Sequence, residues 1–195
     1  MSICNDVSDS PTVEDQILDA TRSCVLDFGL RRTTLAEVAR RAGVSRPTVY
    51  RRWPDTRAVV ADLLTREIGV VIPDMDGDEP ARVQLVRAVV DVTTGMRQHP
   101  LFVKILRSDP DLLMTYIVDR LGASQRAIVE RVSQVVAAGQ ADGSVRSGDP
   151  VHISAMVLLI AQSAVQSSGM VAELLPADEL TGELRSAVDA YLAPR

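Results

Sequence analysis

Apolar side chains recur at three- and four-residue intervals along most of the chain, the spacing that places them on one face of an α-helix. No stretch alternates apolar and polar residues in the way that a half-buried strand does. The first helical run begins at Thr12, where Asp15 three positions later completes a capping signature, and it stops at Gly29. Its inward face consists of Ile17, Thr21, Cys24, Val25 and Phe28. The pattern predicts an all-α protein with almost no strand.

Two short helices are predicted to follow in close succession. Thr34 and Glu37 form a second capping signature, and Gly43 ends this helix after about two turns, too short to stand alone. Ser45 is suited to cap the next helix, in which Pro47 lies in the first turn, where its missing N–H is tolerated. The side chains predicted to point inward from this helix are Val49 and Trp53.

A fourth helix and a body of longer helices complete the prediction. Asp55 caps the fourth helix, which places Val59, Leu63 and Ile68 at apolar positions and continues until Pro73. The acidic, turn-rich stretch at 73–80 is the candidate boundary between two modules. Beyond it the pattern predicts helices at about 81–98, 100–107, 110–139, 150–169 and 177–192.

Length and composition are those of a folded chain. With 195 residues, 46% of them apolar, the protein can bury a substantial core. Residues 1–11 are polar and without periodicity, so we expect them to be disordered. We expect a head over 12–72, which includes the fourth helix, and a helical body over 73–195.

Positive charge is concentrated in one part of the chain. Between Arg31 and Arg57 there are eight arginines and two acids, a net charge of +6, which leaves −11 for the rest of a chain whose formal net charge is −5. A general preference for arginine over lysine accounts for the residue type but not for this clustering. The sequence therefore predicts a basic module attached to an acidic body.

The basic stretch contains the parts of a helix-turn-helix. Ala39 is a small residue where two helices would cross, Gly43 can adopt the positive φ of the turn, and Val49 can anchor the second helix. In helix-turn-helix proteins the start of the second helix meets base edges in the major groove. The sequence therefore predicts a module that binds double-stranded DNA, with a strong dependence on salt.

Two kinds of DNA contact are expected from this module. Arg46 can form two hydrogen bonds to guanine, and Thr48 offers both a hydroxyl and a methyl group to thymine. Neighbouring arginines and hydroxyls suit phosphates, which set the register. The candidate DNA-binding residues are Thr33, Thr34, Ser45, Arg46, Pro47, Thr48, Tyr50, Arg51, Arg52 and Arg57. Alternatives stay open: Thr34 as a cap only, Tyr50 and Trp53 as core residues, and any single arginine as a solvated charge.

The stretch RRTTLAEVARRAGVSRPTVYRRWPDTRAVV, from Arg31 to Val60, resembles the DNA-binding region of the tetracycline-repressor (TetR) family of bacterial transcriptional regulators. The motif is specific, although it covers only about a sixth of the chain. Two positions depart from the family pattern. Thr56 stands where a lysine that contacts phosphate is usual, with Arg57 as the candidate substitute, and Pro47 stands where a small residue is common.

The resemblance implies a homodimer, joined through the last two helices, and a pocket for a small apolar or amphipathic effector. Apolar residues between Val151 and Val165 cover more than one helix face, which such an interface requires. The candidate ligand-binding residues are Met96, His99, Phe102, Leu106, Met114, Tyr116, Ile117, Met156, Leu159 and Gln162. Ordinary core packing is the alternative for each of them.

The sequence lacks the residue patterns that enzymes, metalloproteins and membrane proteins require. Residues 81–195 offer no nucleophile with a base, no carboxylate pair and no cofactor loop, so we expect no enzyme and no cofactor. His99 and His152 have no acids or cysteines at ligand spacing, so we expect no metal site. No secretory signal is evident, and the apolar run from Ile153 to Val165 is shorter than a bilayer requires. We therefore expect a cytoplasmic protein that does not contact the membrane.

Together these expectations describe a ligand-responsive repressor that binds a palindromic operator as a dimer. Two alternatives remain from the sequence. The body of a DNA-binding dimer can answer to a protein partner or to no ligand, or the chain can be a helical enzyme with an appended basic module.

Overall fold

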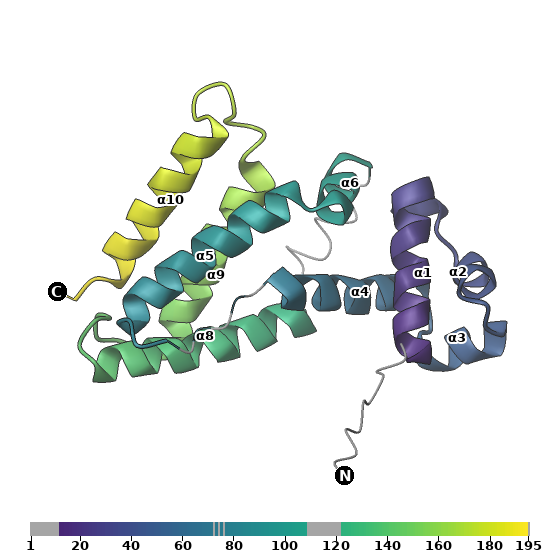
Figure 1. Cartoon of the computed structure of the whole chain (residues 1–195), viewed down its shortest axis with the longest axis horizontal. Coiled ribbons are helices and arrows are strands. Elements are labelled where there is room, and N and C mark those ends of the chain that lie inside the picture. Colours follow the sequence, from purple (N-terminus) through teal and green to yellow (C-terminus); the bar gives the residue numbers. More distant parts are fainter. Residues whose placement is uncertain (1–11, 72, 74, 76, 109–121, 195) are drawn as a thin grey trace, which may run out of the picture. The chain divides into compact units, whose positions relative to one another are not determined.

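The computed structural model describes residues 12–71, 73, 75, 77–108 and 122–194. All regular elements among these residues are helices, which confirms the all-α prediction (Figure 1). The chain divides into two compact units, residues 1–63 (unit 1) and 64–195 (unit 2). The division falls within α4 (Thr56–Val71) and not in the acidic link at 73–80. The predicted disordered segment, 1–11, lies outside the described residues.

Unit 1 begins with three helices and a 3₁₀ turn, whose ends are capped by side chains. The elements are α1 (Val13–Phe28), η1 (Leu30–Arg32), α2 (Leu35–Ala42), α3 (Arg46–Arg52) and the first part of α4. The Thr12 hydroxyl accepts a hydrogen bond from the Asp15 N–H at 3.1 Å, and the Asp15 carboxylate accepts one from the Thr12 N–H at 3.2 Å. At the start of α4 the Asp55 carboxylate accepts a hydrogen bond from the Ala58 N–H at 2.8 Å. Both predicted caps are confirmed, and they satisfy N–H groups that a helix leaves without partners.

The core of unit 1 draws one face from each of its helices. Val25 of α1, Val38 of α2 and Val49 of α3 are fully buried. Trp53 is 2% exposed, and its indole N–H donates to the Asp62 carboxylate at 2.7 Å. This hydrogen bond ties the residue after α3 to α4 and satisfies a polar group that burial would otherwise penalise. The prediction that Val49 and Trp53 point inward is confirmed.

Unit 2 contains the remainder of α4 and five further helices among the described residues. They are α5 (Ala81–Gln98), α6 (Pro100–Ser108), α8 (Ala123–Ala141), α9 (Pro150–Ser167) and α10 (Ala177–Leu192). The prediction of one helix over 110–139 is wrong at Gly122, where the backbone is extended (φ −71°, ψ 173°). Glycine is a poor helix former, and here its N–H donates to the Gln125 side chain at 2.6 Å, so Gly122 starts α8 instead of lying inside a longer helix. Residues 109–121 lie outside the described residues.

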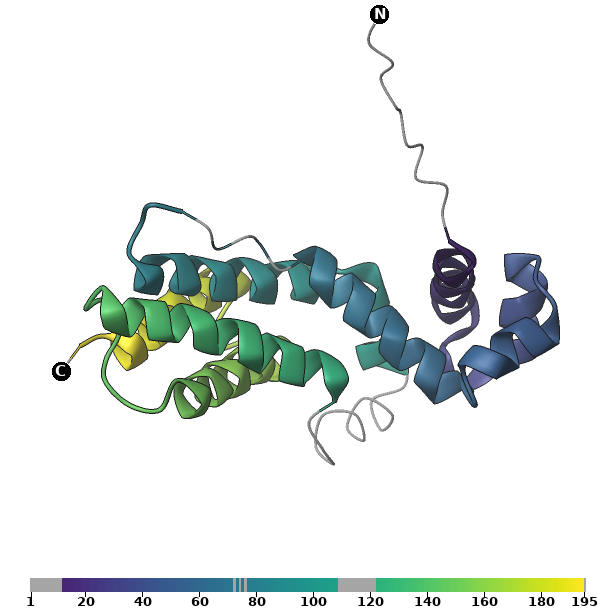
Figure 2. The same cartoon turned by 90° about the horizontal axis from the view of Figure 1, so that it is seen from below.

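The core of unit 2 lies between α5 and the helices around it. α5 packs against α8, α9 and α10, and Figure 2 shows α8 and α9 side by side, in agreement with their extensive contact. The buried cluster consists of Leu85, Val86, Val89, Val90, Val136, Val145, Ile153, Val157, Leu184, Val188 and Leu192. The start of α5 is held by the distant loop after α8, because Asp142 and Ser144 accept hydrogen bonds from the N–H groups of Ala81 (3.0 Å) and Arg82 (3.2 Å).

One side of α9 remains at the surface of the protomer. Ile153 and Val157 are buried in the core, whereas Met156 is 43% exposed and Leu159 is 58% exposed. The expectation that α9 is apolar on more than one face is therefore confirmed. Among the described residues, α9 is the helix that is long and apolar enough to cross a membrane. Core helices of soluble proteins share these two features, and α9 packs against α5, α8 and α10.

Candidate nucleic-acid interface

The turn between α2 and α3 has the geometry that a helix-turn-helix requires. Gly43 ends α2 in the left-handed region, at φ 69° and ψ 23°, and the Val44 N–H donates to the Ala39 carbonyl at 3.1 Å. A side chain is disfavoured in this conformation, so the glycine is needed for its backbone freedom. Ala39 is 1% exposed and Val49 fully buried, which places the small crossing residue and the anchor of α3 where the sequence predicted them.

The start of α3 is fixed by a local cap. The Ser45 hydroxyl accepts a hydrogen bond from the Thr48 N–H at 3.3 Å and lies 2.8 Å from the Thr48 hydroxyl. Pro47 lies in the first turn, where no N–H is required. Ser45, Arg46 and Pro47 are exposed, so the first turn of α3 presents its side chains to solvent.

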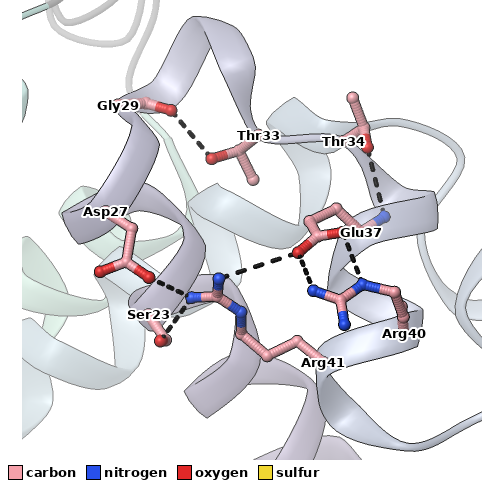
Figure 3. A network of polar contacts seen from close by, with 8 residues as sticks. All are labelled: Ser23, Asp27, Gly29, Thr33, Thr34, Glu37, Arg40 and Arg41. Atoms are coloured by element: carbon pink, nitrogen blue, oxygen red, sulfur yellow. Dashed lines mark hydrogen bonds and ion pairs between the residues drawn. The ribbon is translucent and has the colours of Figure 1, made fainter.

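Two arginines of α2 are held by carboxylates of unit 1 (Figure 3). Arg40 donates two hydrogen bonds to Glu37, at 2.9 and 2.6 Å, and Arg41 donates to Asp27 at 2.5 Å and to Ser23 at 2.7 Å. The hydrogen bond from Arg40 lowers the pKa of the Glu37 carboxyl below its ordinary value. In return, Glu37 raises the pKa of Arg40, and Asp27 raises the pKa of Arg41. These two positive charges are therefore largely compensated inside unit 1.

The arginines of α3 differ from one another in their partners. Arg52 donates to Glu14 of α1 at 2.8 Å and lies 5.8 Å from the centre of the Trp53 ring. Arg46 and Arg51 are exposed and form no ion pair or hydrogen bond within the part of the chain that the structure describes. Among the described residues, no carboxylate neutralises these two charges, so both guanidinium groups are available to an outside anion.

The remaining candidates for DNA contact fall into different environments. Thr33 is 4% exposed and its hydroxyl donates to the Gly29 carbonyl at 2.9 Å, so this side chain lies inside unit 1 (Figure 3). Thr34 is exposed and accepts a hydrogen bond from the Glu37 N–H at 3.2 Å, which gives it the cap role that was left open. Tyr50 is 52% exposed, which excludes the alternative that it is a core residue. Arg57 is also exposed.

Sequence reasoning missed the acids that hold these arginines. Glu37 precedes Arg40 and Arg41 by three and four residues, a helical spacing that signals an ion pair. No comparable signal marks Asp27 or Glu14, which pair with arginines 14 and 38 residues away.

The candidate ligand-binding residues of unit 2 do not form one group. His99 Nε2 lies 3.1 Å from a Glu67 carboxylate oxygen, and the His99 ring meets the buried Phe102 ring edge-on, with centroids 5.4 Å apart. His99 Nδ1 is buried without a hydrogen-bond partner among the described residues. Leu106 lines a surface cleft, and Met96 and Gln162 are partly buried.

Other candidates in unit 2 lie elsewhere or are not described. Met156 and Leu159 are at the protomer surface and do not line the interior of unit 2. They are exposed because α9 has a second apolar face that the core does not cover. Met114, Tyr116 and Ile117 lie outside the described residues. Within the residues that are described, no three His, Cys, Asp or Glu side chains are grouped so that they could hold a metal ion.

Similarity to known proteins covers both the head and the full length. Residues 17–63 match the family model described as bacterial regulatory proteins, tetR family. The HTH-type transcriptional regulator Rv2250c of Mycobacterium tuberculosis (strain ATCC 25618 / H37Rv), described as uncharacterized, is 44% identical over 192 residues, which cover 98% of this chain and 99% of the relative.

Solved structures with the same fold have much lower identity. FadR from Bacillus subtilis, in complex with stearoyl-CoA, has a TM-score of 0.63 and 16% identity, and the match covers 91% of this chain and 96% of FadR. RolR, in complex with resorcinol, has a TM-score of 0.68 and 13% identity, covering 94% of this chain and 88% of RolR. The sequence match and the helix-turn-helix geometry agree. The chain belongs to the tetR family of bacterial regulatory proteins, and it is a DNA-binding transcriptional regulator and not an enzyme.

Proposed function

We propose that the protein is a homodimeric repressor that binds a palindromic operator and is released by a small apolar or amphipathic effector. One α3 helix from each protomer enters the major groove of one half-site, so the two-fold symmetry of the dimer sets the half-site spacing. Residues 12–72 act as the DNA-binding head and residues 73–195 as the effector-binding and dimerisation body. The regulator works in the cytoplasm, where its DNA is accessible.

The observation that carries the proposal is the pair of uncompensated arginines on α3. Arg46 lies at the exposed start of the helix, where it can donate two hydrogen bonds to guanine O6 and N7. Thr48 lies three residues after Ser45, on the same side of the helix. Its hydroxyl contacts the Ser45 hydroxyl, and its methyl group can contact thymine. Arg51 and Tyr50 are assigned to phosphates, which position the helix without reading sequence.

The other candidate contacts are assigned by their environments. Arg52 can contact phosphate after exchanging its exposed pair with Glu14, a pair that costs little to break at the surface. Arg57 is exposed next to Thr56 and is our candidate for the phosphate contact that lysine makes in the family. Thr33 is not among the proposed contacts, because its side chain is buried.

The dimer interface is assigned to the outer faces of α9 and α10. Met156 and Leu159 are three residues apart on α9 and exposed, an apolar surface that a partner helix can cover. On α10, Gly182, Ser186 and Ala190 repeat every four residues and are exposed, so a second α10 can approach closely. Such a pair of helices from each protomer would form a four-helix interface.

The effector pocket is assigned to the region of unit 2 around His99 and Phe102. His99 Nδ1 is a buried polar atom without a partner among the described residues, next to an aromatic ring that suits an apolar ligand. Ligand binding by FadR and RolR, which share the fold, supports a ligand-responsive body. The effector can release DNA only if it binds the DNA-incompetent arrangement more tightly, by about 5.5 kcal/mol for a near-complete switch.

Operator binding followed by release tests the proposal. Duplexes selected from a random pool at near-physiological salt are labelled, and fluorescence anisotropy follows their dissociation as apolar and amphipathic compounds are added. We expect compounds that raise the melting temperature of the protein alone to lower its operator affinity. Operator binding that no stabilising compound changes would instead support a body that answers to a protein partner or to no ligand.

A further inference from the structure

Unit 2 has a surface cleft beside the region around His99, and its lining includes Gln98, Val103 and the candidate residue Leu106. Its volume is about 410 Å³, within the range of small-molecule sites, and it is formed where the end of α5, α6, the end of α9 and the start of α10 meet. Figure 1 shows these four segments at the same end of unit 2. The cleft is therefore built by segments that are far apart in the sequence, from Thr94 to Thr181.

The charges that line this cleft are unusual for an acidic body. Arg97 of α5 and Arg107 of α6 both line it, and neither forms an ion pair or a hydrogen bond with any residue that the structure describes. Elsewhere in unit 2, Arg82 and Arg87 are paired with carboxylates, of Asp189 and Glu79 respectively. The acid in the cleft lining is Asp178, so the two guanidinium groups outnumber it.

The remaining lining provides hydrogen bonds and an apolar floor. Amide and hydroxyl side chains come from Thr94, Gln98, Gln166 and Thr181, and apolar side chains come from Val103, Leu106 and Val165. α10 begins in the cleft without a side-chain cap, and the acids Asp178 and Glu179 in its first turn offset the positive end of its dipole, so the arginines carry the attraction for an anion. Guanidinium groups match the planar, two-oxygen geometry of carboxylates and phosphates, and apolar neighbours exclude water from such a pair.

We propose that this cleft binds a small amphipathic organic anion. Its carboxylate or phosphate group lies between Arg97 and Arg107, and its apolar part contacts Leu106 and Val165. The anion compensates two charges that have no partner among the residues that the structure describes. The inference rests on the proposed effector-binding role of unit 2 and narrows the effector class. It does not require the DNA contacts, so anion binding can be tested in protein without DNA, separately from operator release.

Isothermal titration calorimetry of the full chain with four probes tests the site. Octanoate and octyl phosphate carry both the anion and the chain, 1-octanol carries the chain alone, and inorganic phosphate carries the anion alone. We expect the two amphipathic anions to bind more tightly than 1-octanol and inorganic phosphate. A preference between octanoate and octyl phosphate identifies which anionic group the cleft favours.

Variants locate the binding. Arg97→Gln and Arg107→Gln should each lower the affinity for the preferred anion by about tenfold or more, because each removes a charge-assisted contact. Arg185→Gln removes an exposed arginine of α10 that does not line the cleft and should leave the affinity unchanged. All three replace solvent-accessible side chains without internal partners among the described residues, so circular dichroism and melting temperature should match the parent protein. Equal affinity for octanoate and octanol, no binding of either anion, or binding that survives both variants would overturn the proposal.

Discussion

Single residues decide which positive charges of the head are available to DNA. Arg40, Arg41 and Arg52 each contact a carboxylate of unit 1, whereas Arg46 and Arg51 contact none among the described residues. A compensated arginine must exchange one anionic partner for another when it meets phosphate, so its net gain is small. An arginine without a carboxylate partner breaks no ion pair, so the full interaction energy of the phosphate contact adds to DNA binding. Both arginines of α2 are compensated, whereas α3 holds one compensated arginine, Arg52, and two that are not, Arg46 and Arg51.

Replacing Arg51 by alanine should weaken DNA binding about equally for all sequences. Each phosphate contact contributes about 0.9 to the slope of log affinity against log salt concentration through release of counterions. The dimer loses one such contact per protomer, so the magnitude of the slope should fall by about 1.8. Fluorescence anisotropy at several salt concentrations measures this slope. Arg185→Ala, which removes an exposed arginine of unit 2, is the matched control and should leave the slope as it is. An unchanged slope in the Arg51 variant would mean that this side chain does not contact phosphate.

Glu37 should make the head sensitive to acid. The pKa of its carboxyl is lowered below the ordinary value of 4.5 by Arg40, so folding favours the charged form. Its contribution to stability is complete above that value and is lost as the pH falls through the lower pKa of the folded state. Glu37→Gln should therefore lower stability at neutral pH and flatten the loss of stability below about pH 4.5.

The stability of the head can be measured separately through the single tryptophan. Trp53 is the one tryptophan of the sequence and is buried in unit 1, so denaturant unfolding followed by its fluorescence reports the head. Glu183→Gln, on the exposed side of α10, serves as the control and should leave the pH profile unchanged. Identical profiles for the parent and Glu37→Gln would show that the ion pair does not contribute.

Helix ends were predictable where their partners are close in the sequence. The caps at Thr12, Thr34 and Ser45 bind N–H groups three residues away, which a short motif can reveal. The start of α5 was placed correctly at residue 81, but its partners Asp142 and Ser144 are 61 and 62 residues away and belong to no local pattern. The break at Gly122 was missed because apolar periodicity continues on both sides of it.

The same distinction applies to the candidate interface. Ala39, Gly43 and Val49 were identified because each has a fixed place in the helix-turn-helix. The pairing of Arg41 with Asp27 and of Arg52 with Glu14 depends on how α1 packs, and only the folded unit reveals it. Which arginines are uncompensated therefore could not be derived from their positions in the sequence.

At the level of packing, Gly139→Ala should destabilise the body. A methyl group at Gly139 would overlap the Val145 side chain and lie 3.2 Å from the Ala81 methyl, where α8 approaches the start of α5. Overpacking of this kind costs about 1–3 kcal/mol. Gly69→Ala on α4 meets no atom within 4 Å and should instead add up to about 1 kcal/mol. Thermal unfolding followed by circular dichroism measures both, and a Gly139 variant as stable as the parent would contradict the close contact.

At the scale of the whole molecule, Leu159→Glu should separate the dimer without unfolding the protomer. Leu159 is 58% exposed, so the charge stays in water in the monomer and becomes costly only when α9 meets its partner. Sedimentation should give the monomer mass, and operator affinity should fall because the two half-sites are no longer bound together. Val83→Glu replaces a side chain of α5 that is 42% exposed and should remain dimeric. A dimer that persists in the Leu159 variant would place the interface elsewhere.

The role of α3 in reading DNA is tested by comparing the sequences that the parent protein and Arg46→Ala select from one random duplex pool. The parent should recover a palindrome with a guanine at a fixed place in each half-site. The variant should fold, remain dimeric and lose the preference at that position alone, at a cost of about 1–3 kcal/mol per half-site. The same palindrome recovered with equal preference by both proteins would contradict the assignment of α3, through Arg46, as the element that reads the operator.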